Sequence, residues 1–163
     1  MTSLPDFRSF ARLRGLLFVG ASALSVASST LNAADQRTYI GSRSNADVPA
    51  GYAFSDAVLV GDTLYLSGHL GLDPNRQLPA DPEIEARHVL DNVKATLHAA
   101  GMSMDDLVSV TITCTDLSLY ARFNAIYKSY FKKEFPARAF LGTDRLLFGA
   151  RFEVVGIAVK RKP

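Results

Sequence analysis

Residues 81–101 read DPEIEARHVLDNVKATLHAAG and are followed, after a short link, by VSVTITC at residues 108–114. In the first stretch apolar side chains recur every three or four residues, which predicts an amphipathic helix capped by Asp81 and ended by Gly101. In the second stretch apolar residues alternate with Ser and Thr, which predicts a strand with one buried face. Cys114, the only cysteine, then belongs to the core. A helix packed on such a strand indicates a domain of the α+β class.

The chain before this helix has the pattern of a β-hairpin. Residues 54–67 form two short β-prone runs around Gly61-Asp62, a pair of residues typical of a tight turn. Residues 68–82 contain three prolines and an Asp-Pro-Asn turn, which predict a loop. The hairpin therefore leads through a loop into the helix.

The chain after the strand predicts a second helix and two more strands. An aromatic stripe over residues 123–130 marks the helix, with Ser118 as its cap and its end before Pro136. Packing in the core is the favoured interpretation of that stripe. Residues 137–141 and 150–160 are the predicted strands. The order is β-β-α-β-α-β-β, one sheet with two helices on one face, and an oligomer is the simplest cover for the other face.

The first 33 residues have the layout of a signal peptide. Residues 1–14 carry three arginines against one aspartate, and residues 15–34 are uncharged and end in small side chains. We therefore expect a signal peptide over residues 1–33, cleavage near Ala33 and a domain over residues 34–163 in the periplasm or outside the cell. A membrane anchor is an alternative, because twenty uncharged residues could span a bilayer, and an organelle transit peptide is another. After cleavage we expect no stable membrane insertion.

Charge and composition exclude several classes of function. The chain has 18 basic and 16 acidic residues, and removal of the three Arg and one Asp before residue 34 leaves 15 of each sign. Such a balance offers no basic stripe for nucleic acid. A single cysteine forms no internal disulfide, and no Cys/His pairing has the spacing of a zinc site. With no nucleotide-binding loop either, we expect no cofactor and no metal.

Four short motifs, in this order, resemble the Rid family of YjgF-like proteins. They are LYLSG at residues 64–68, LDNVK at 90–94 with AAG at 99–101, FPAR at 135–138 and EVVGIAV at 153–159. The resemblance implies a chorismate-mutase-like fold and a homotrimer with a central barrel and a ligand cleft at each subunit interface. The best-known members hydrolyse enamines and imines, such as 2-aminoacrylate and 2-iminopropanoate, to 2-oxo acids and ammonia.

The resemblance also implies a set of site residues. Arg138 stands at the family's arginine position, where a guanidinium can hold a substrate carboxylate through two parallel hydrogen bonds. Without the family pattern, a strand-end arginine paired with a surface carboxylate is the alternative. The other residues expected around a small carboxylate or imino-acid ligand are Tyr52, Ser67, Gly68, Asn124 and Phe140.

Three positions depart from the deaminating members. They carry a glutamate where this chain has Val155, often a cysteine where it has Phe140, and often a glutamine where it has His69. Glu153 shares a strand face with Val155, and the unperturbed pKa of a histidine such as His69 suits water activation near neutral pH, so both are candidate bases to activate water. For His69, packing is the alternative. The sequence thus predicts an imine deaminase or, with Val155 in the pocket, a trimer that only binds small carboxylates; a surface with holdase-like activity is a third hypothesis.

Overall fold

The computed structural model describes residues 36–41 and 53–161. The predicted signal peptide over residues 1–33 and the candidate ligand contact Tyr52 lie outside these residues. Within the described part, no helix has the length and apolar character needed to cross a membrane.

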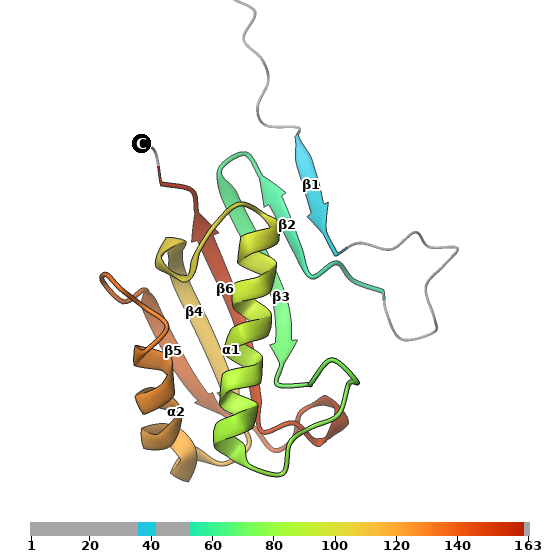
Figure 1. Cartoon of the computed structure of the whole chain (residues 1–163), viewed down its shortest axis with the longest axis vertical. Coiled ribbons are helices and arrows are strands. Elements are labelled where there is room, and N and C mark those ends of the chain that lie inside the picture. Colours follow the sequence, from blue (N-terminus) through green and yellow to red (C-terminus); the bar gives the residue numbers. More distant parts are fainter. Residues whose placement is uncertain (1–35, 42–52, 162–163) are drawn as a thin grey trace, which may run out of the picture. The chain divides into compact units, whose positions relative to one another are not determined.

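Among the described residues, six strands form one sheet in the order β1-β2-β3-β6-β4-β5 (Figure 1). All neighbours are antiparallel except β4 and β5, which run parallel. The strands span Arg37–Ile40 (β1), Ala57–Val60 (β2), Thr63–Leu70 (β3), Leu107–Cys114 (β4), Ala137–Gly142 (β5) and Phe152–Val159 (β6).

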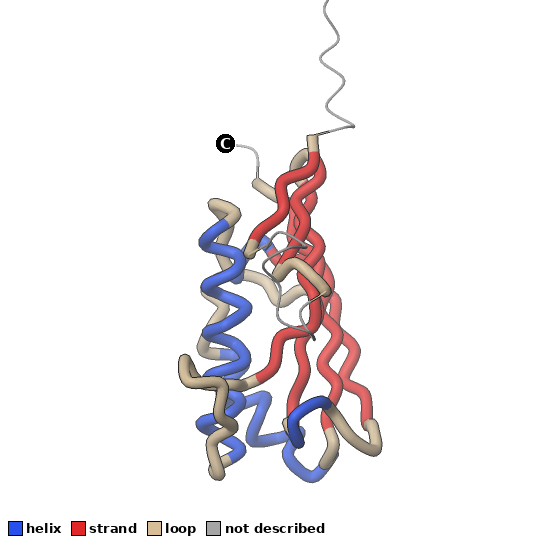
Figure 2. Tube along the Cα trace, turned by 90° about the vertical axis from the view of Figure 1, so that its right-hand side faces the viewer, coloured by secondary structure: helices blue, strands red, loops and turns tan. Residues whose placement is uncertain are grey.

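Two crossover connections place the helices. Helix α1 (Pro82–Ala99) joins β3 to β4, and α2 (Tyr120–Lys128) joins β4 to β5. Both steps run in the same direction across the sheet, and crossovers of this kind are right-handed, so both helices are expected on one face. Figure 2 shows them on the same side of the sheet. The predicted two-layer α+β fold is confirmed.

Helix α1 begins and ends where its sequence predicts. The Asp81 carboxylate accepts a hydrogen bond from the Glu83 backbone N–H at 2.8 Å, and Pro82 occupies the first turn. Gly101 follows the helix with φ of +71°, a left-handed conformation that favours glycine. Glu85 is the exception to the pattern, since this charged residue in the first turn is fully buried.

Helix α2 is entered differently from the prediction. A short 3₁₀ turn over Leu117–Leu119 precedes it, and the Asp116 carboxylate accepts from the Ser118 backbone N–H at 2.9 Å. Asp116, not Ser118, is therefore the capping side chain, because the chain begins to coil three residues before α2. The aromatic stripe does pack: Phe123, Ile126 and Tyr127 are buried.

The sheet is larger than the sequence predicts at two places. Strand β1, which pairs with β2, is not among the predicted strands, because four residues are too few to establish an alternating pattern. Strand β3 continues to Leu70 through a register shift between Leu66 and His69, whereas the sequence predicts a loop from residue 68. A glycine in a strand often marks such a bulge.

The core lies between the sheet and the helices, and none of the described helices covers the other face of the sheet, which we call the open face. Cys114 is fully buried, as predicted, and its thiol donates to the Asp116 carbonyl. Strand alternation turns a second set of apolar side chains away from the helices. Five of these are more than one-third exposed: Tyr39, Tyr65, Leu141, Val155 and Val159.

Candidate functional site

Arg138 lies near the start of the edge strand β5, held from α2. Alternation along β5 leaves Arg138 and Phe140 half-buried on the helix side, while Ala137 and Ala139 are exposed. Arg138 Nη1 donates to Asn124 Oδ1 at 2.7 Å. No carboxylate within residues 36–41 and 53–161 forms an ion pair with Arg138, unlike in a surface salt bridge. The structure thus brings three of the predicted residues together.

Aromatic rings surround the guanidinium. Its central carbon lies 4.8 Å from the ring centre of Tyr127, 5.8 Å from that of Tyr120 and 6.0 Å from that of Phe140. At these distances the ring faces attract the cation. Phe135, just before β5, stacks on the ring of Tyr127 with centroids 6.4 Å apart. Rings and amide together fix the direction of the Arg138 side chain.

The guanidinium keeps donors for a ligand. Arginine has five N–H donors, and here one goes to Asn124 and one, at a long 3.5 Å, to the Tyr120 hydroxyl. Three N–H groups therefore have no partner among the described residues. A planar cation with several spare donors suits a carboxylate, which accepts two parallel hydrogen bonds.

Sequence reasoning missed Tyr120 and did not connect Tyr127 with Arg138. Helical spacing could have found both, since residues 120, 124 and 127 lie on one face of a helix. Burial raises the pKa of Tyr127 to about 12, and its buried hydroxyl has no hydrogen-bond partner among the described residues. The pKa of Tyr120 is lowered, first by a hydrogen bond from the Asn124 side chain and then by the charge of Arg138.

Three further candidates gather where β3 meets β6. The Ser67 hydroxyl donates to the Ser55 carbonyl at 2.6 Å, and the Ser67 N–H donates to the Asp56 carbonyl at 3.0 Å. Gly68 is exposed, and a Cβ on it would collide with the carboxylate of Glu153. The Glu153 carboxylate therefore lies directly over the Ser67-Gly68 segment. It can occupy this position because residue 68 is a glycine and has no Cβ.

His69 faces the opposite way, toward α1. Its Nδ1 lies 2.8 Å from the Ser67 carbonyl oxygen, and its Nε2 lies 2.8 Å from Thr96 Oγ1. A carbonyl only accepts, so Nδ1 carries the proton and Nε2 accepts from the threonine hydroxyl. Burial lowers the pKa of His69, against smaller raising effects of the Ser67 hydrogen bond and of Asp56 and Glu153. Both ring nitrogens are thus engaged within the fold.

Val155 lies on the open face of the sheet, two residues along β6 from Glu153. It pairs with Thr111 of β4 and is 39% exposed. The side chains of Glu153 and Val155 share this face, as the sequence predicts, because the buried residues Phe152, Val154 and Gly156 alternate with them. The acidic group of this face is thus Glu153, and Val155 adds apolar surface beside it.

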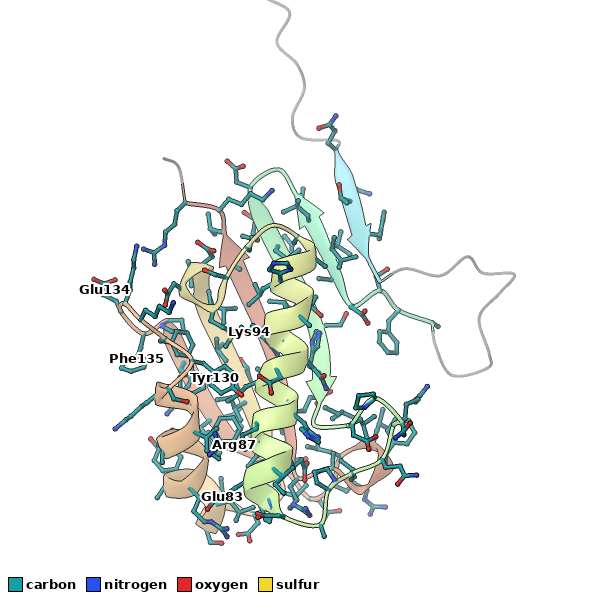
Figure 3. All side chains as sticks on the ribbon, viewed as in Figure 1. Glu83, Arg87, Lys94, Tyr130, Glu134 and Phe135 are labelled. Atoms are coloured by element: carbon teal, nitrogen blue, oxygen red, sulfur yellow. The ribbon has the colours of Figure 1, made fainter. Side chains whose placement is uncertain are left out.

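One chain does not bring the two groups of residues together. Strands β6 and β4 separate β3 from β5, and three strand spacings amount to about 14 Å. The Arg138 group also faces the helices, whereas Glu153 faces the open side. A hollow of about 790 Å³ lies elsewhere, between α1 and the segment after α2, where Lys94 and Tyr130 line it (Figure 3). It includes none of the predicted site residues.

Most of the chain is similar to known proteins. A family model described as Endoribonuclease L-PSP matches residues 45–160. A 2-iminobutanoate/2-iminopropanoate deaminase from Bos taurus is 38% identical over 120 residues, which cover 72% of this chain and 88% of that relative.

Two solved structures show the same likeness. The crystal structure of RidA from an Antarctic Psychrobacter is 35% identical, with a TM-score of 0.66 and coverage of 69% of this chain and 92% of that one. TdcF from E. coli, solved with bound serine, is 31% identical, with a TM-score of 0.65 and coverage of 76% and 94%. The residues that the family model matches include both helices and strands β2 to β6.

Proposed function

This chain belongs to the endoribonuclease L-PSP family, together with YjgF and RutC proteins, and on that premise we propose that it is an imine deaminase. In the proposed reaction, water adds to the imine carbon of a small 2-imino acid such as 2-iminopropanoate. The C–N bond of the resulting adduct then breaks, and a 2-oxo acid and ammonia leave. Relatives named 2-iminobutanoate/2-iminopropanoate deaminase support this choice of reaction.

The observation that carries the proposal is the Arg138 guanidinium, which Asn124 orients and which has three N–H donors without a partner among the described residues. Its role in the proposed reaction is to bind the substrate carboxylate. Because Tyr127 and Phe140 form an apolar wall around it, water competes poorly there and each hydrogen bond to the carboxylate gains strength.

Glu153 is the base that we assign to the water. Its carboxylate lies over the backbone of Gly68, so a ligand that reaches this segment also reaches an acceptor for the proton of the attacking water. We assign His69 a different role, because its nitrogens already bind Ser67 and Thr96. It holds the Ser67-Gly68 segment from the helix side.

The site that we propose forms between two copies of the chain in a homotrimer. Two observations support it: Arg138 and Glu153 face opposite sides of one sheet, and the open sheet face carries exposed apolar side chains such as Tyr65 and Leu141. Burial of those side chains in a central barrel would remove them from water, at about 25 cal/mol per Å². Sedimentation equilibrium should give three times the mass of the chain, and a monomer would contradict the shared site.

Phe140 and Val155 favour a second function for the same cleft. Both are apolar where polar or acidic groups are expected in deaminating members, and an apolar pocket suits a larger carboxylate and excludes water. The alternative function is therefore a trimer that binds a small carboxylate without turning it over.

One experiment separates the two functions. The steady-state hydrolysis of 2-iminopropanoate, generated in situ, is measured with wild-type protein and with Arg138→Ala. A clear rate in the wild type that is lost in the variant would support the deaminase. If the wild type shows no rate above the uncatalysed reaction but binds pyruvate in a way that requires Arg138, the carboxylate-binding function is favoured. The proposed deaminase activity is then overturned.

We also propose that the chain is exported, with cleavage near Ala33. Mass spectrometry of protein recovered from its native cells should give a mature chain that begins at Ala34. An intact N-terminus in a membrane fraction would favour the anchor instead.

A further inference from the structure

Tyr120 places a hydroxyl beside the proposed carboxylate site. It is the first residue of α2, the residue as a whole is 46% exposed, and its ring meets Phe140 edge to face with centroids 5.0 Å apart. Its oxygen lies 3.5 Å from Arg138 Nη2. The packing fixes the ring, and the exposure leaves the oxygen open to a ligand.

The phenolic O–H of Tyr120 is available to donate a hydrogen bond to a ligand. A tyrosine hydroxyl has one donor and two acceptor positions. The Tyr120 oxygen accepts, at the long distance above, from Arg138 Nη2. Its O–H has no acceptor among the described residues. The Asn124 side chain and the charge of Arg138 lower the pKa of the hydroxyl, which makes it a stronger hydrogen-bond donor.

We propose that Tyr120 is a second substrate-binding residue, whose O–H donates to the same carboxylate that Arg138 holds. This inference rests on the proposed function, because it assumes that Arg138 binds the substrate carboxylate. It makes the site one of three side chains: Asn124 orients Arg138, and Arg138 and Tyr120 donate to the ligand. The consequence is a preference for ligands with a free carboxylate over the corresponding amides or esters, which lack the second anionic oxygen.

Tyr120→Phe is a clean test, because phenylalanine keeps the edge-to-face contact with Phe140 and removes only the oxygen. Tyr130→Phe is the matched control. The Tyr130 hydroxyl donates to Asp91 Oδ1 at 2.9 Å in the hollow between α1 and the segment after α2 (Figure 3). Both variants are made in the full-length chain, and far-UV circular dichroism with sedimentation checks that each retains the wild-type fold and assembly.

Two measurements are made on the three proteins. The first is the steady-state kinetics of imine hydrolysis, with 2-iminopropanoate as the substrate, and the second is the dissociation constant of pyruvate by titration calorimetry. A hydrogen bond to a charged group contributes substantially to the binding free energy. In Tyr120→Phe its loss should raise KM and the pyruvate dissociation constant by about 10-fold or more, while the turnover number changes by less than about 2-fold. Tyr130→Phe should match the wild type in all three constants.

The outcomes separate this inference from the proposed function. In one outcome, the wild type binds pyruvate without turning over the imine, and Tyr120→Phe binds pyruvate more weakly. This result would overturn the proposed deaminase activity and support the Tyr120 contact. Turnover with unchanged KM and pyruvate affinity in Tyr120→Phe, or a fall confined to kcat, would overturn the Tyr120 contact and leave the deaminase standing. No pyruvate binding and no turnover in the wild type would overturn both.

Discussion

Glu153 is the residue on which the proposed chemistry depends most directly. Glu153→Gln keeps the shape of the side chain over Gly68 but removes the basic oxygen. We expect the turnover number of the imine hydrolysis to fall by about 10²–10⁴-fold, the usual contribution of a general base, while pyruvate still binds. Glu134→Gln, in the loop before β5, is the matched control and should retain full activity (Figure 3). Full activity in Glu153→Gln would remove the assigned base.

The hydrogen bond between His69 and Thr96 belongs to the supporting role that we propose for His69. Burial lowers the pKa of His69 in the folded state. The unfolded chain then binds more protons than the folded one below about pH 6.5, so the stability that neutral His69 contributes is present above that pH and lost as the pH falls.

A stability measurement in urea checks this sign. The free energy of unfolding of the wild type should fall between pH 7.5 and pH 5.5 more steeply than that of His69→Gln, by at most about 1.4 kcal/mol per pH unit. Asp56 and Glu153, the acidic groups whose charges act on His69, are present in both proteins, so the difference isolates the histidine. Equal slopes would contradict the assignment.

At the scale of elements, a buried ion pair ties α1 to β6. The Glu85 carboxylate lies 2.9 Å from Arg151 Nε, and its other oxygen accepts from the Arg151 and Phe152 backbone N–H groups at 2.6 and 3.1 Å. The Arg151 guanidinium also donates to the Pro79 and Ala80 carbonyls, which fixes the loop before α1. Helix, strand and loop therefore meet at one buried carboxylate.

Glu85→Gln should be strongly destabilising, because it leaves the half-buried Arg151 charge without its partner. We expect a loss of about 3 kcal/mol in the free energy of unfolding, measured in urea. Asp144→Asn breaks the exposed pair with Arg145, whose side chains are 87% and 89% exposed, and should cost less than about 0.5 kcal/mol. A similarly small effect for Glu85→Gln would mean that the backbone hydrogen bonds alone hold this junction.

The sequence predicts those elements whose own pattern is sufficient. Helix α1 has a capping Asp81, a terminal Gly101 and periodic apolar residues over its 18 residues, so nothing outside it is needed to find it. Strand β1 and the extension of β3 depend on pairing with neighbours distant in sequence, which local periodicity does not contain. Glu85 is a similar case, since its burial depends on Arg151, far along the chain.

The candidate site divides in the same way. The FPAR motif leads to Arg138, and the helical spacing from Asn124 could have led to Tyr120, because these contacts are local to α2 and β5. The orientation of His69 depends instead on the bulge in β3, which turns the ring toward α1. A bulge reverses the sheet face of the residues that follow it. When the sequence does not reveal the bulge, the sheet face of those residues cannot be predicted either.

At the scale of the whole molecule, the position of Arg138 and Glu153 on opposite sides of the sheet makes the proposed site a property of the assembly. Arg138→Ala and Glu153→Gln each remove one half of it. If the halves come from different copies, a trimer that mixes the two variants contains interfaces with an intact Arg138 from one copy and an intact Glu153 from the other.

Mixing the two inactive variants should therefore restore activity. With equal amounts and random assembly after co-expression, about one interface in four receives both intact residues, so we expect about a quarter of the wild-type hydrolysis rate. The chain that carries both substitutions, co-expressed with wild-type protein under another tag, controls for dilution, and each variant alone gives the baseline. If the mixture is as inactive as each variant alone, Arg138 and Glu153 of one chain serve the same site. Both side chains would then have to reach that site from opposite faces of a single sheet.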